Sequence, residues 1–113
     1  MLVVDRAYIS RIEGIDHGLK SLDQILFESL LQLEEARIKE DKRLIDLVNS
    51  LSEESIHKEI RYKGFETGNT TYTINMTLIT LFNHQTHHRG QIHNMLSQAG
   101  IKPPQIDIPD FIE

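Results

Sequence analysis

The sequence contains no cysteine, no tryptophan and only three prolines. Without cysteine the chain can form neither a disulfide nor a thiolate ligand, so any bound metal ion must be held by nitrogen and oxygen atoms. Basic residues are also scarce, because 12 lysines and arginines stand against 17 aspartates and glutamates, for a net charge of −5. A nucleic-acid-binding face needs an excess of positive charge, so this balance argues against nucleic acid as a partner.

Long apolar runs are missing as well. No stretch approaches the roughly 20 apolar residues of a membrane span, and the first residues lack the basic start and cleavage site of a signal peptide. We therefore expect a cytoplasmic protein that does not contact membranes. With 113 residues, of which 39% are hydrophobic and 26% charged, the chain has the size and composition of one globular domain, residues 1–113.

Apolar residues recur at helical spacing in three stretches, which predict three helices. The predicted helices span residues 2–13, 27–51 and 75–99. Because polar turns join them, the expected fold class is all-α, an antiparallel up-down helical bundle. The first helix would be about half as long as the last, and it begins without a capping side chain. The bundle is therefore expected to be incomplete at its N-terminus.

The segments between the predicted helices carry turn and strand signals. A serine-capped helical turn is expected over residues 22–26. Two β-prone runs flank Gly68-Asn69 and favour a short β-hairpin or an extended loop before the last helix. In the middle helix, Arg37 and Asp41 belong either to a solvated charged face or to an inward-facing polar pair. The C-terminal tail alternates apolar and acidic residues and is expected to lie across the bundle.

Four of the six histidines fall in the short stretch NHQTHHRGQIH. At about 100° per residue, His84 and His88 lie one turn apart and about 40° around the last helix, so their rings can converge on one point. This is the geometry of a two-histidine metal half-site. A stable zinc site needs three or four ligands, so a pair of this kind on its own is more often incidental than metal-binding. His87 and His93 are expected outside the pair, and His57 on the surface.

The stretch LFNHQTHHRGQIHNMLSQAGIKPPQIDIPDF resembles the C-terminal helix and tail of the DinB family of bacterial four-helix-bundle proteins. Two earlier stretches are similar to the same family: VVDRAYISRIEG to the end of its second helix, and SLDQILFESLLQLEEARIKEDKRLIDLVNSL to its third. The resemblance covers nearly the whole chain. It implies a DinB-type bundle that lacks its first helix.

The resemblance also implies a divalent metal, nickel or zinc, bound by three histidines that face the bundle interior. Two of these map onto His84 and His88. The third comes from the family's second helix, at or just before the position of Met1, and is absent here, so metal binding is expected to be weak or absent. Asp5 is the nearest substitute ligand, and a ligand from another subunit is the alternative.

Two classes of function follow from the resemblance. The first is a metal-dependent enzyme, a thiol transferase or hydrolase-type enzyme, in which the metal acts as a Lewis acid on a small-molecule thiol. Arg89 or Gln91 would then orient an anionic substrate. The second is a non-catalytic truncated bundle, a stress-associated structural or interaction protein. In both cases we expect a homodimer that buries the apolar face left by the absent helix.

Overall fold

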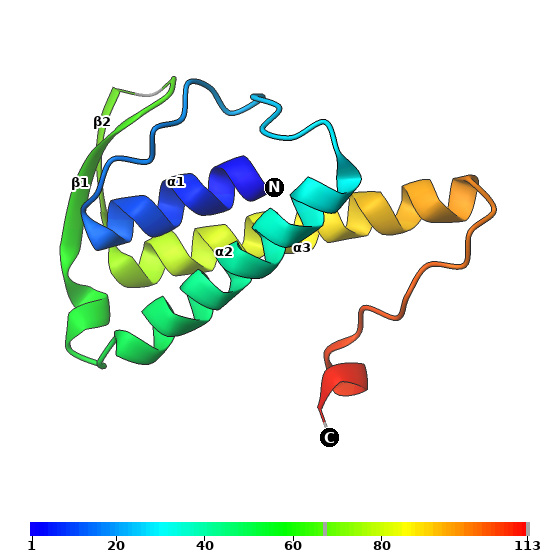
Figure 1. Ribbon diagram of the computed structural model, residues 1–113. Helices are drawn as coiled ribbons and strands as arrows, with labels where there is room; N and C mark the ends of the chain where they lie inside the picture. Colours follow the sequence, from blue (N-terminus) through cyan, green and yellow to red (C-terminus); the bar gives the residue numbers. More distant parts are fainter. Residues whose placement is uncertain (67, 113) are drawn as a thin grey trace.

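The computed structural model describes residues 1–66 and 68–112 of the chain. Within them, three α-helices and one β-hairpin form the fold (Figure 1). The elements are α1 (Leu2–Glu13), α2 (Leu30–Ser50), the 3₁₀ turn η1 (Ser55–His57), β1 (Glu59–Gly64), β2 (Gly68–Thr73), α3 (Ile74–Gln98) and the 3₁₀ turn η2 (Ile108–Phe111). The hairpin lies at one end of the helices and leads directly into α3.

The helix ends follow from local capping. Gly14 ends α1 in the left-handed conformation, with a φ of 73°, which a residue with a side chain rarely adopts. Ser29 begins α2, because its hydroxyl accepts a hydrogen bond from the backbone N–H of Gln32. Thr73 begins α3 in the same way, accepting from the N–H of Met76 at 3.1 Å. These ends agree with the three predicted helices to within a turn.

The predicted all-α class is wrong, because β1 and β2 form a two-stranded antiparallel sheet. The register runs from Glu59 opposite Thr73 to Gly64 opposite Gly68. Threonine and tyrosine dominate the second strand, and these residues favour extended backbone over helix. The hairpin that the sequence offered as one alternative to an extended loop is therefore present.

Two further expectations are corrected. Residues 22–26 form no helix, and the Ser21 hydroxyl donates to the Asp23 carboxylate at 2.7 Å instead of capping one. The C-terminal tail does not lie across the bundle. It turns back after α3 and runs away from the helices in the view of Figure 1. Pro104 and Ile106 share a small cavity with Ile92 of α3, and residues 105–110 of the tail are exposed.

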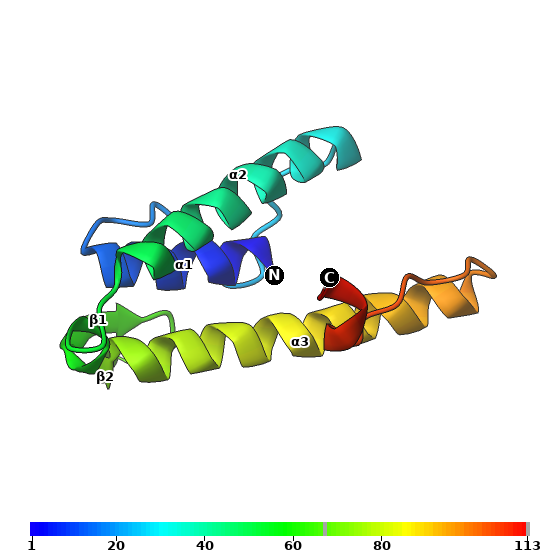
Figure 2. The same cartoon turned by 90° about the horizontal axis from the view of Figure 1, so that it is seen from below.

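The centre of the core is a small cluster with one residue from each helix. Ile9, Leu44 and Leu81 are buried together and are covered by half-buried apolar neighbours. α1 packs against both α2 and α3, whereas α2 and α3 contact each other little. Figure 2 shows α1 and α2 on one side and α3 on the other. α1 is therefore the element that holds the other two helices together.

The molecule is more extended than a compact domain of its length. Its radius of gyration is 15.6 Å, against about 13 Å expected for 113 residues. The C-terminal half of α3 projects beyond the packed helices, as Figure 2 shows. Among the described residues, no helix has the length and apolar character needed to cross a membrane.

Candidate metal-binding site

His84 and His88 come together on α3 as the helical spacing predicts. Their ring centroids lie 4.4 Å apart in an edge-to-face arrangement, and their Nε2 atoms are 3.2 Å apart. Both side chains are half-buried on the flank of the helix. Each imidazole thus has its Nε2 atom directed toward the other ring, so the two Nε2 atoms lie close together.

The separation of the two Nε2 atoms fits a shared metal ion. With metal–nitrogen bonds of 2.0–2.1 Å, two ligand nitrogens lie about 2.9 Å apart at a 90° angle and about 3.3 Å apart at a tetrahedral angle. The observed 3.2 Å lies between these values. The distance between the two nitrogens is therefore that of two adjacent ligands of one metal ion.

Gln91 fixes the protonation pattern of the pair. Its amide oxygen lies 2.8 Å from His88 Nδ1, and because an amide oxygen only accepts, the proton of neutral His88 is on Nδ1. His88 Nε2 is then an acceptor and receives a hydrogen bond from His84 Nε2. His84 Nδ1 is consequently bare, and it is buried without a hydrogen-bond partner. Gln91 thus orients His88 as a second-shell amide would orient a metal ligand.

The surroundings of His84 keep it neutral. Burial, followed by the positive charge of a protonated His88, lowers the pKa of His84 from its ordinary value. The carboxylate of Asp5 acts in the opposite direction but does not outweigh them. A neutral imidazole is the form that binds metal.

The other predicted polar residues lie outside the pair. His87 is exposed, and its ring stands 5.4 Å from that of His88. His93 faces the tail, beside Pro104. His57 is exposed, as expected. Arg89 donates to the hydroxyl of Thr86 on the same helix rather than reaching toward His84.

Asp5, the substitute ligand suggested by the sequence, is fully buried and already engaged. Its Oδ2 accepts hydrogen bonds from Arg37 and, at 3.0 Å, from the side-chain amide of Gln85. Arg37 also forms an ion pair with Asp41 at 2.7 Å, but the Asp41 side chain is 55% exposed. Of these two residues only Arg37 therefore turns inward, toward Asp5, while Asp41 belongs to the solvated face. Asp5 Oδ1 is buried without a hydrogen-bond partner. This network ties α1, α2 and α3 together at the level of His84.

The residues present fit half of a metal site. Two imidazoles have the right separation, and His88 has the right tautomer, whereas His84 would have to move its proton from Nε2 to Nδ1. Two buried acceptor atoms, His84 Nδ1 and Asp5 Oδ1, lack partners. In residues 1–66 and 68–112, however, no three histidine, aspartate or glutamate side chains are grouped so that they could hold a metal ion. Further ligands would have to be water, a substrate or another chain.

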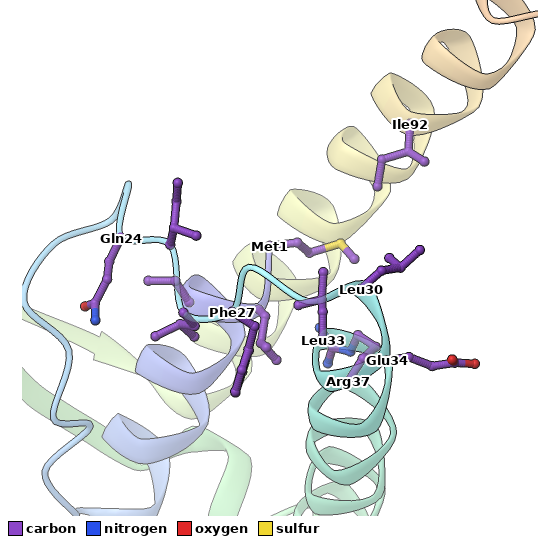
Figure 3. A pocket seen from close by; sticks show the side chains of 12 residues that line it. Met1, Gln24, Phe27, Leu30, Leu33, Glu34, Arg37 and Ile92 are labelled. Carbon is purple, nitrogen blue, oxygen red and sulfur yellow. The ribbon is translucent and has the colours of Figure 1, made fainter.

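An apolar cavity of a different character lies away from the histidine pair. It measures about 500 Å³ and lies between the start of α1, the segment before α2, the start of α2 and Ile92 of α3 (Figure 3). Its walls are mostly apolar, and its one cationic side chain, Arg37, is paired with Asp5 and Asp41. This cavity brings no reactive groups together.

Sequence reasoning missed a second cavity, of about 300 Å³, which His84 shares with Arg11, Tyr8 and Tyr62. It lies between α1, the hairpin and α3. Helical spacing places Tyr8 and Arg11 on one face of α1, which was the only available signal. Nothing in the sequence places that face against a strand 50 residues further on.

Comparison with known proteins identifies a family for this chain. A family model described as the DinB family matches residues 1–113, the whole chain. Neither a curated protein nor a solved structure gives a significant match.

Proposed function

The chain belongs to the DinB family, and from this premise we propose that it binds a divalent metal ion through Nε2 of His84 and His88. The observation that carries the proposal is the 3.2 Å separation of these two atoms. Zinc and nickel both accept imidazole ligands at this spacing.

The chain's own residues prepare the pair for this role. Gln91 holds the proton of His88 on Nδ1, which leaves Nε2 free as a ligand. His84 releases its Nε2 when its proton moves to the bare Nδ1, a change of tautomer that needs no change in net charge. The lowered pKa of His84 keeps this imidazole neutral near pH 7.

The reaction that this site would support is thiol chemistry on a small molecule. A bound divalent metal supplies Lewis acidity that lowers the pKa of a coordinated thiol or water. With only two protein ligands, the remaining coordination positions are open to such a molecule. A thiol transferase or hydrolase-type activity is therefore the function we propose for the chain as an enzyme.

Metal binding is tested by titrating zinc and nickel into the protein with calorimetry. We expect one metal ion to bind per histidine pair. The affinity for the metal should fall about tenfold or more in His84→Ala and in His88→Ala. His87→Ala is the matched control, because His87 is an exposed imidazole next to the pair. Unaltered binding in the first two variants would refute the site.

A second candidate function has its own observation in support. No third side chain of the ligand type joins the histidine pair in the described part of the chain. A bundle with a hydrogen-bonded histidine pair and no metal would be a structural or interaction protein. The same titration distinguishes the two functions, because this candidate requires that neither zinc nor nickel binds.

We also propose that two copies associate through α2. Leu31, Ile38 and Ile45 recur every seven residues and are 66%, 63% and 59% exposed. They lie away from the face on which Ala36 and Leu44 are buried. Because an uncovered aliphatic stripe of this kind is costly in water, a second copy that covers it would stabilise both chains.

A further inference from the structure

Arg11 occupies an unusual position in the cavity that it shares with His84. Its guanidinium carbon lies 4.1 Å from the centroid of the Tyr62 ring, 5.4 Å from that of Tyr8 and 5.7 Å from that of Phe65. Three aromatic rings from α1 and the hairpin thus surround one cation. Cation–π contacts of this kind hold a guanidinium in a fixed orientation.

Arg11 also lacks a carboxylate partner among the described residues. The other arginines of α1 and α2 all pair with acids: Arg6 with Glu40, Arg37 with Asp5 and Asp41, and Arg43 with Glu13 and Glu40. Arg11 forms no such pair, and its Nε is buried without a hydrogen-bond acceptor. Glu66 lines the same cavity but is exposed and does not bond Arg11.

A guanidinium that stacks through its faces keeps its N–H edges available. These edges match the two oxygens of a carboxylate or phosphate, and such charge-assisted bonds are the strongest that side chains make. Burial, followed by the neighbouring Tyr8, raises the pKa of Tyr62 despite the nearby Arg11. The Tyr62 hydroxyl therefore stays protonated and can donate as well.

The rest of the cavity suits the body of a small molecule. Its volume of about 300 Å³ is at the lower end of the range for ligand sites. Tyr8, Tyr62, Phe65 and Tyr72 supply aromatic walls, and His84 supplies a neutral imidazole. These groups favour a ligand with one anionic end and an aromatic or apolar remainder.

We infer that this cavity binds a small organic anion, with its carboxylate or phosphate held by the edge of Arg11 and its apolar body between the tyrosines. The inference deepens the proposed function, because His84 lines the same cavity. It rests on the proposed function only where it places the bound anion beside a metal ion. Anion binding itself needs no metal.

The alternative is a purely structural role, in which Arg11 only stabilises the end of its helix. It lies in the last turn of α1, where a positive charge interacts favourably with the helix dipole. In that case its substitution would lower stability and leave ligand binding unchanged. Measuring anion affinity in Arg11 variants therefore distinguishes a ligand-binding role from a purely structural one.

The test uses the full chain in the presence of a chelator and follows backbone amide signals by NMR. Phenylacetate and phenyl phosphate are titrated separately, with neutral phenylacetamide as the uncharged counterpart. We expect both anions, or one of them, to shift signals of α1 and the hairpin, and phenylacetamide to bind at least about tenfold more weakly. The comparison of the two anions distinguishes a carboxylate site from a phosphate site.

The variants assign the binding to Arg11. Arg11→Met keeps an apolar stem and should weaken anion binding about tenfold or more, whereas Arg61→Met, which removes an exposed arginine next to Tyr62, should not. Arg11→Lys keeps the charge at the helix end and loses the planar fork, so it should fold normally and still bind the anion more weakly.

Three results would overturn the inference: no anion binds, phenylacetamide binds as well as phenylacetate, or Arg11→Met and Arg11→Lys both bind like the wild type. His88→Ala separates this inference from the proposed metal site, because it should retain anion binding under chelation. Anion binding without any zinc or nickel binding would remove the proposed metal function and leave this inference standing.

Discussion

Replacing Asp5 by asparagine tests the buried network that joins the three helices. Asp5 is fully buried, and its carboxylate accepts bonds from Arg37 of α2 and Gln85 of α3. Asparagine has nearly the same volume, so the substitution removes the charge without leaving a cavity. The guanidinium of Arg37 then faces a neutral group that also carries its own N–H donors.

The expected loss can be worked out from the exposure of the partners. Removing one member of a buried ion pair costs about 3–5 kcal/mol, mostly because a charge stays buried and unpaired. Here the Arg37 side chain is 21% exposed and retains Asp41, so we expect about 2–3 kcal/mol. Since small domains have a free energy of unfolding of only about 5–15 kcal/mol, this is a large fraction of the total.

Urea unfolding followed by circular dichroism measures this loss. With a urea slope of about 1–3 kcal/mol/M, a loss of about 2–3 kcal/mol should lower the transition midpoint by roughly 0.7–3 M with little change in slope. Asp41→Asn is the matched control: its side chain is 55% exposed, and the expected loss is at most about 1 kcal/mol. An Asp5→Asn protein within about 0.5 kcal/mol of the wild type, or equal to Asp41→Asn, would refute the account of the core.

The remaining predictions concern pH, association and capping. Because the pKa of His84 is lower in the folded chain than its unfolded value of about 6.5, the unfolded state binds more protons, and the free energy of unfolding should fall as the pH falls from 6.5 through the folded pKa. This decrease should be smaller in His84→Gln in urea titrations at a series of pH values, and an identical decrease would contradict the assignment. Ile38→Glu should convert a dimer to a monomer in sedimentation equilibrium, with the exposed Lys39→Glu as control, and a monomeric wild type would rule out the α2 interface. Thr73→Ala should lower the free energy of unfolding by about 1 kcal/mol through loss of the α3 cap, and a loss as small as that of Thr71→Ala, which caps no helix, would contradict that role.

Features that depend on short-range spacing could be predicted from the sequence. The periodicity of α1 and the glycine after it place that helix correctly, and the i, i+4 spacing brings His84 and His88 together. The role of this pair in metal binding stays a prediction. The spacing signal is strong because helix geometry fixes the relative positions of residues one turn apart.

Features that depend on tertiary packing could not be predicted from the sequence. The hydrogen bond between Asp5 and Gln85 joins residues 80 positions apart, and the stacking of Arg11 on Tyr62 requires the hairpin to lie against α1. Local sequence does not encode either contact. The sequence before α3 is compatible with either a β-hairpin or a loop, because two short strands gain their stability from packing on the helices as well as from propensity.

In the tail and in residues 22–26 the local sequence pattern predicts the wrong structure, for a related reason. Apolar alternation in the tail indicated burial, yet Ile108 is 74% exposed. A serine before an apolar run, Ser21, indicates a helix cap, yet its hydroxyl donates a hydrogen bond to the carboxylate of Asp23 instead. In both cases a local pattern is compatible with several partners, and only the folded chain selects one.

The most direct test of the metal-binding pair is side-chain nitrogen NMR of the histidines with and without zinc. Before zinc is added, the proton of His84 should be on Nε2 and that of His88 on Nδ1, as their hydrogen bonds require. With zinc, both rings should carry the proton on Nδ1 and show metal-bound Nε2 atoms, while His87 stays unchanged. Coordination through Nδ1, coordination by His87 in place of His84, or no change on adding zinc would contradict the account.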